Sequence, residues 1–100
     1  MYGLKDSHIE KIQTVFSNFS QIEKVSLYGS RAKGNFRPES DIDLSLIGNT
    51  IDLNVLLKIE NQLDDLLLPY TIDLSIFHKI ENPDFVDHIN RVGLVFYVKK

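Results

Sequence analysis

The chain has 100 residues, 43% of them hydrophobic and 25% charged, with a formal net charge of −3 and no cysteine. The length predicts one domain over residues 1–100, and the missing cysteines exclude disulfides and thiolate zinc sites. The negative charge argues against direct nucleic-acid binding, which normally needs a basic face, and no apolar run approaches the roughly 20 residues of a membrane span, so we expect a cytoplasmic protein without a membrane contact.

The first 34 residues predict a helix, a short strand and a helical turn, in that order. Ser7 and Glu10 have the spacing of a capping box, and apolar residues follow at helical intervals, namely Ile9, Ile12, Val15, Phe16 and Phe19. Residues 24–28 alternate between polar and apolar side chains, which indicates a strand that ends at Gly29. Residues 30–34 then predict a short helical turn.

A second strand and a second long helix are predicted over the middle of the chain. Residues 41–47 alternate, with three aliphatic side chains on one face and with Asp41, Asp43 and Ser45 on the other. Six apolar residues then recur at helical spacing before the helix-ending Pro69: Leu53, Leu56, Ile59, Leu63, Leu66 and Leu67.

The last third of the chain predicts a strand, a helix and another strand. Residues 71–77 alternate as a third strand. Asn82 and Pro83 are typical of the N-cap and first position of a helix, and Gly93 is typical of its end. Residues 94–98 are expected to form a fourth strand, at an edge. Strands that alternate with helices indicate an α/β layer, but this pattern leaves the order of the strands open.

Two of the predicted strands carry the same four residues at their centre. Residues 42–45 and 72–75 both read Ile-Asp-Leu-Ser, and the two-residue period of a strand places Asp43 and Asp73 on the polar face. If the strands are neighbours, Asp41, Asp43 and Asp73 gather in one place, where their mutual repulsion favours a bound cation. Magnesium is the best candidate, because it prefers oxygen ligands and completes its coordination with water and substrate phosphates.

The turn after the first predicted strand carries groups that suit a phosphate. Gly29 lets backbone N–H groups approach an anion closely, and Ser30 adds a hydroxyl donor. Arg31, Lys33 and Arg37 follow, and they would offset the charge of a triphosphate. Each feature alone is common, since a Gly-Ser pair is more often an ordinary turn. Their order along the chain, from Gly-Ser turn to Asp-x-Asp strand to single-Asp strand, favours a site for magnesium and a nucleotide.

The segments Tyr-Gly-Ser-Arg-Ala-Lys-Gly at 28–34, Asp-Ile-Asp-Leu at 41–44 and Ile-Asp-Leu at 72–74 resemble the nucleotidyltransferase superfamily related to DNA polymerase β. More closely, they resemble its minimal nucleotidyltransferases, the MNT antitoxins of prokaryotic HEPN/MNT toxin–antitoxin pairs. The resemblance implies an α/β (α+β) fold with a small mixed sheet of three to four strands and about four helices.

The resemblance also implies roles for the candidate residues. Asp41 and Asp43 would bridge two Mg²⁺ ions, and Asp73 would bind the catalytic ion and help to activate the attacking hydroxyl. Ser30 would hold the β- and γ-phosphates of ATP. The further nucleotide-binding candidates at this turn are Gly29, Arg31 and Lys33.

A protein partner is implied in the same way. The resemblance implies transfer of AMP from ATP to a tyrosine hydroxyl of a HEPN-domain ribonuclease toxin, which the chain would thereby neutralise as an antitoxin. The alternative is a non-catalytic antitoxin or nucleotide-binding module that inhibits its partner by direct binding. The presence of Ser30 together with Asp41, Asp43 and Asp73 favours catalysis. The base preference, the acceptor, and the choice between homo-oligomer and hetero-oligomer stay open.

Overall fold

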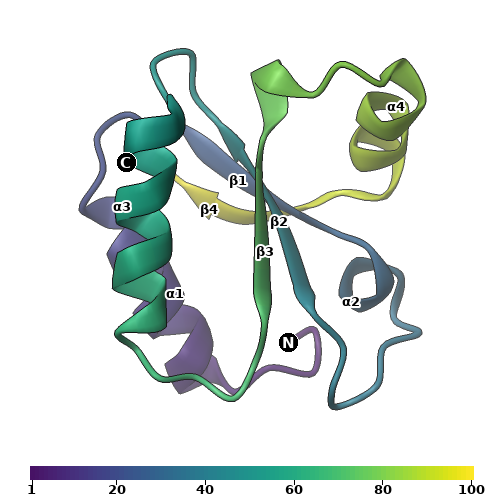
Figure 1. Cartoon of the computed structure of the whole chain (residues 1–100). Helices are drawn as coiled ribbons and strands as arrows, with labels where there is room; N and C mark the ends of the chain where they lie inside the picture. Colours follow the sequence, from purple (N-terminus) through teal and green to yellow (C-terminus); the bar gives the residue numbers. More distant parts are fainter.

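Four strands form one mixed sheet, and helices lie on both of its faces (Figure 1). The computed structural model describes residues 1–100 and contains, in chain order, α1 (Asp6–Ser17), β1 (Lys24–Tyr28), α2 (Ser30–Lys33), β2 (Ile42–Ile47), α3 (Leu53–Asp64), β3 (Ile72–Ile76), the 3₁₀ turn η1 (Phe77–Lys79), α4 (Pro83–Val92) and β4 (Leu94–Val98). The strand order is β3-β2-β1-β4, with β1 antiparallel to both β2 and β4 and with β2 parallel to β3. The predicted fold class and the edge position of the last strand are therefore confirmed.

The apolar face of the sheet is covered by α1 and α3, which lie side by side (Figure 1). Most of the buried hydrophobic residues form one cluster of 16, to which α1 contributes Ile12 and Phe16 and α3 contributes Ile59 and Leu63. The central strands β1 and β2 add their alternate residues, which are Val25, Leu27, Ile42, Leu44 and Leu46. Full burial of one such side chain contributes about 1.5–3 kcal/mol, so this face supplies most of the stability.

The opposite face of the sheet carries the polar residues of the strands and is only partly covered. α4 packs across β1 on this side, where the Phe85 ring meets the Tyr28 ring edge-on with centroids 5.5 Å apart. The short helix α2 follows the end of β1, also on the side away from α1 and α3 (Figure 1). Between these two helices the sheet stays open: Asp43 is half-buried and Asp73 is exposed.

The start of α1 differs from the sequence prediction. The helix begins at Asp6 after Lys5, and no side chain caps it, so the capping box expected from Ser7 and Glu10 does not form. Asp6 instead places a negative charge in the first turn, where it interacts favourably with the unpaired N–H groups. The predicted cap of α4 is confirmed, because the Asn82 side chain accepts hydrogen bonds from the first turn of that helix.

The end of α3 also differs from the prediction. The helix stops at Asp64, and Leu67 lies beyond it with a left-handed φ of 55° and an exposed fraction of 88%. Leu53, at the other end of the expected apolar stripe, is exposed as well. The stripe that faces the core is therefore shorter than the sequence pattern. None of the helices combines the length and the hydrophobicity that crossing a membrane requires.

Gly48, directly after β2, allows a close approach of two backbone segments. The Cβ of an alanine at this position would overlap the carbonyl oxygen of Gln21, which is backbone and cannot rotate away. We expect Gly48→Ala to lower the free energy of unfolding by about 1–3 kcal/mol, measured by urea denaturation. Asn49→Ala, at the exposed neighbouring position, should change it by less than about 0.5 kcal/mol. Equal effects of the two substitutions would contradict the close-approach explanation.

Candidate active site

Parallel pairing of β2 with β3 places the two Ile-Asp-Leu-Ser segments side by side and in register. Asp43 is the direct neighbour of Asp73, and Ser45 is the direct neighbour of Ser75. Because adjacent strands lie about 4.8 Å apart, the two carboxylates leave the sheet from neighbouring positions on its polar face. The sequence left the order of the strands open, and the structure shows that these two strands are neighbours.

Asp41 lies just before β2, two residues from Asp43 and therefore on the same side of the sheet. Between them, Ile42 donates its N–H to the carbonyl oxygen of Thr71 at 2.9 Å, which ties the start of β2 to the segment that leads into β3. Asp41 is exposed, as is Asp73. All three predicted carboxylates therefore lie at one end of the β2–β3 pair.

Asp43 holds its negative charge in an unfavourable environment. Burial raises the pKa of Asp43 above its ordinary value, and the negative charges of Asp73 and Asp41 raise it further. A cation at this place would remove both the repulsion and part of the cost of burial. The electrostatics of the site thus favour a bound positive charge.

The carboxylates suit a magnesium ion whose coordination is completed by water and substrate. In the structure, no group of three or more histidine, cysteine or acidic side chains lies close enough to enclose a metal ion. The three aspartates therefore do not form the compact cluster that the sequence indicated. Magnesium commonly takes one or two protein carboxylates and completes its octahedron with water and substrate phosphates, so the pair of Asp43 and Asp73, with Asp41 beside it, suits this ion. Two bound ions stay a prediction.

Gly29 joins the end of β1 to α2, and two observations explain why it is glycine. Its φ of 77° and ψ of −157° fall in a region that is essentially reserved for glycine. A Cβ at this position would also overlap the carboxylate of Asp43. Tyr28, the preceding residue, pairs with Asp43 across the two strands. The structure therefore brings the predicted Gly-Ser turn directly beside a predicted carboxylate.

Ser30 is the first residue of α2 and is half-buried at this turn. Its carbonyl oxygen accepts the N–H groups of Gly34 and Asn35 at 3.0 and 3.2 Å, which closes the turn around it. Lys33, at the end of α2, is exposed. Binding of a nucleotide by Gly29, Ser30 and Lys33 stays a prediction that is compatible with this geometry.

Arg31 does not lie where the sequence placed it. Its side chain is only 2% exposed, and its guanidinium donates hydrogen bonds to the carbonyl oxygens of Tyr2, Pro38 and Ser40. Four of its five N–H groups are engaged in this way, so little of the side chain remains for a phosphate. The prediction that Arg31 binds the nucleotide is wrong, because burial and backbone carbonyls hold the guanidinium inside the fold.

Three hydroxyl groups beside the carboxylates were not among the predicted site residues. Ser75 donates a hydrogen bond to Ser45 at 3.1 Å, and Ser45 is completely buried. Burial raises the pKa of the Tyr28 hydroxyl, and the negative charges of Asp73 and Asp43 raise it further. The hydrogen bond with Ser75 acts in the opposite direction and lowers it. The repeated Ile-Asp-Leu-Ser already placed both serines on the polar face. Only the structure brings the Tyr28 hydroxyl to them.

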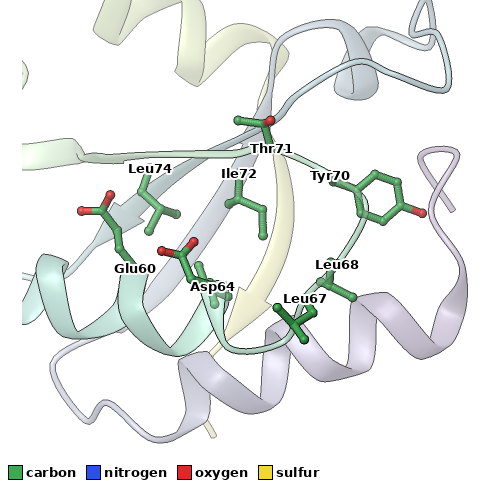
Figure 2. Close-up of a pocket in the computed structure, with 9 residues that line it drawn as sticks. Glu60, Asp64, Leu67, Leu68, Tyr70, Thr71, Ile72 and Leu74 are labelled. Atoms are coloured by element: carbon green, nitrogen blue, oxygen red, sulfur yellow. The ribbon is translucent and has the colours of Figure 1, made fainter.

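The pocket between α3 and β3 lies away from these residues (Figure 2). It has a volume of about 350 Å³, and Ile72 and Leu74 line it from β3 while Glu60 and Asp64 line it from α3. Asp73, between the two strand residues, faces the other side of the sheet. The pocket therefore contains none of the candidate site residues, and we do not assign the nucleotide to it.

Comparison with known proteins supports the same chemistry. The family model for polymerase beta nucleotidyltransferases matches residues 10–100. The fold is similar to a chain in the crystal structure of a toxin–antitoxin with AMP-PNP, with a TM-score of 0.72 and 19% identity over 97% of this chain and 76% of that chain. Among curated proteins, no sequence match was found.

Two further solved structures are similar. One is a tri-AMPylated HEPN toxin of Shewanella oneidensis in complex with an MNT antitoxin, with a TM-score of 0.69 and 16% identity over 96% of this chain and 74% of that chain. The other is a toxin–antitoxin MntA-HepT, with a TM-score of 0.67 and 16% identity over 95% and 74% of the two chains. At such identities these similarities establish the fold, as predicted, and leave the partner open.

The raised pKa of Asp43 makes the stability of the metal-free protein depend on pH. Because the folded state holds the Asp43 proton more tightly than the unfolded state, stability falls as pH rises from the ordinary aspartate range through the raised pKa. We expect Asp43→Asn to remove this fall. The free energy of unfolding of the variant, relative to that of the wild type, should therefore be higher at pH 7 than at pH 4. Urea denaturation in EDTA at both pH values measures the difference.

The matched control for this prediction is Glu60→Gln, which removes one negative charge from α3 on the other face of the sheet. It should not reproduce the pH-dependent gain. If Asp43→Asn and wild type differ by the same amount at pH 4 and pH 7, the repulsion between the carboxylates is not significant.

Proposed function

The chain belongs to the polymerase beta nucleotidyltransferase family, and from this premise we propose that it transfers AMP from ATP to a hydroxyl group of a partner protein. The observation that carries the proposal is the in-register pair of Asp43 and Asp73 beside the turn at Gly29 and Ser30. In the fold, carboxylates for magnesium therefore lie beside donors for a triphosphate, although these residues are far apart in the sequence.

In the proposed reaction, the acceptor oxygen forms a bond to the α-phosphorus of ATP, and the bond from that phosphorus to the β-phosphate bridging oxygen breaks. Ser30 and the backbone of its turn hold the β- and γ-phosphates. Asp41, Asp43 and Asp73 would hold magnesium, which when bound would supply positive charge to the phosphates and lower the pKa of the incoming hydroxyl. Pyrophosphate leaves with the negative charge that develops on it.

Asp73 is best placed to receive the acceptor. It lies on the edge strand β3 and is exposed, whereas Asp43 is half-buried between β1 and β3. A hydroxyl that approaches from solvent therefore reaches the Asp73 carboxylate more easily than that of Asp43. We assign to its oxygen the transient uptake of the hydroxyl proton.

The partner that we propose is a HEPN-type ribonuclease toxin, with a tyrosine hydroxyl as the acceptor, so that the chain acts as an antitoxin. Support comes from the similar folds in the AMPylated HEPN toxin complex and in the toxin–antitoxin with AMP-PNP. The net charge of −3 disfavours a nucleic-acid acceptor, since like charges would repel. The cytoplasmic location expected from the sequence belongs to the same proposal.

Incubation of the protein with ATP, magnesium and the protein encoded by the neighbouring gene tests this function. Mass spectrometry of the partner should show added AMP, located on a tyrosine. Asp43→Ala and Asp73→Ala should each lower the rate by at least about 100-fold, because each removes a carboxylate on which the magnesium site depends.

One control variant and two alternative outcomes help to interpret that experiment. Glu60→Ala, on the opposite face of the sheet, should retain the wild-type rate. A partner that is fully inhibited yet unmodified would support the alternative function, an antitoxin that acts by direct binding. Elongation of a nucleic-acid primer by the isolated protein would contradict the proposed acceptor.

Ser30→Ala tests the phosphate-binding turn separately. Loss of one charge-assisted hydrogen bond is worth about 1.5–3 kcal/mol, so we expect kcat/KM for ATP to fall by roughly 10- to 150-fold with little change in stability. Ser40→Ala is a less suitable control because its hydroxyl accepts from Arg37. Ser20→Ala, at an exposed position before the opposite end of β1, should leave kcat/KM unchanged. Wild-type kinetics in Ser30→Ala would exclude a role for this hydroxyl.

A further inference from the structure

We propose that Arg31 is a positioning residue, whose buried guanidinium fixes the starts of β2 and β3 relative to each other and to the Ser30 turn. It would thereby set the spacing of Asp41, Asp43 and Asp73. The importance of that spacing for magnesium rests on the proposed function, whereas the clamp itself can be measured without metal.

The guanidinium donates hydrogen bonds to three backbone carbonyl groups, which belong to two segments far apart in the chain. Nη1 donates to the Tyr2 carbonyl oxygen at 2.9 Å, and Nη2 donates to the carbonyl oxygens of Pro38 and Ser40 at 3.2 and 2.9 Å. Nε donates to the same Ser40 oxygen at 3.2 Å. None of these acceptors is a carboxylate, so the hydrogen bonds that help to compensate for the removal of this cation from water all go to neutral carbonyl groups. The geometry of the carbonyl groups is therefore tied to the position of one side chain.

Two aromatic rings complete the surroundings of this cation. The guanidinium carbon lies 5.2 Å from the centre of the Phe36 ring and 5.4 Å from the centre of the Tyr70 ring, within the range of cation–π attraction. The Tyr70 hydroxyl is in turn 3.1 Å from Nδ1 of His8 on α1. Arg31 thus joins α2, the loop before β2, the segment before β3 and the first residues of the chain.

These contacts lie next to the candidate metal ligands in the chain. Ser40 immediately precedes Asp41, and Tyr70 precedes Thr71, whose carbonyl oxygen accepts the N–H of Ile42. Arg31 itself follows Ser30. The Arg31 side chain therefore contacts the residue before Asp41 and the segment before β3, and its own backbone follows Ser30. It is not proposed to touch the metal ion or the phosphates itself.

The chemistry of the side chain explains why arginine is needed. An apolar residue would fill the space without burying a charge, but the carbonyl groups of Pro38 and Ser40 would lose their partner and the loop would lose its anchor. A lysine would keep the charge. Its single nitrogen cannot span three carbonyl groups while also stacking on Phe36 and Tyr70.

Amide hydrogen exchange in EDTA measures the clamp without metal or substrate. In Arg31→Lys and Arg31→Met, we expect the Ile42 N–H, bonded to Thr71, to exchange at least about 10-fold faster relative to the Glu23 N–H than in wild type. Glu23 donates to Ile47 at the opposite end of β2, so it reports on general loss of stability. An unchanged ratio in both variants would overturn the proposal, and if Arg31→Met does not fold, Arg31→Lys decides.

Titration with Mn²⁺ followed by electron paramagnetic resonance measures the consequence for the carboxylates. Both Arg31 variants should bind Mn²⁺ at least about 10-fold more weakly than wild type, because their ligands are no longer held in place. Lys58→Met, which removes the same charge from an exposed position of α3, should bind like wild type. Equal affinity in wild type and Arg31→Lys would overturn the role in spacing. If wild type itself does not bind Mn²⁺, the proposed function fails, while hydrogen exchange still decides the clamp.

Discussion

The parallel, in-register pairing of β2 with β3 is the constraint on which the rest of the structure depends. A parallel pair needs a long crossover connection, and α3 supplies it while covering the apolar side of both strands. The polar side is left with Asp43 and Asp73 as neighbours. The turn that follows β1 must then pass beside Asp43, which is why a glycine with an unusual backbone conformation stands at position 29.

One face of the sheet stabilises the fold, and the other face carries the candidate active site. The buried cluster against α1 and α3 supplies the free energy, and this allows the other face to keep carboxylates that repel one another. A protein selected for stability alone would not place Asp43 half-buried next to Asp73. Local violation of the rule that charges are paired is typical of functional sites.

The sequence predicted those parts of the site that follow from periodicity, and missed those that depend on distant contacts. Alternation placed Asp43 and Asp73 on the polar face of their strands, but only the structure shows that these strands are neighbours. Arg31 was misjudged because its place directly after Ser30, with Lys33 and Arg37 following, indicated a phosphate ligand. Its burial instead depends on distant contacts with Tyr2, Phe36 and Tyr70. No local sequence pattern indicates that segments so far apart in the chain meet around the Arg31 guanidinium.

The position of β1 in the sheet has a consequence for synthesis of the chain. β1 is a central strand, and its second neighbour, β4, is the last strand along the chain, with Lys24 paired to Val98. While the ribosome has not yet released residues 94–98, one edge of β1 has no partner and exposes its N–H and C=O groups. Such an edge can pair with a strand of another nascent chain. The interval between release of β2 and docking of β4 is therefore the stage at which this fold is most exposed to aggregation.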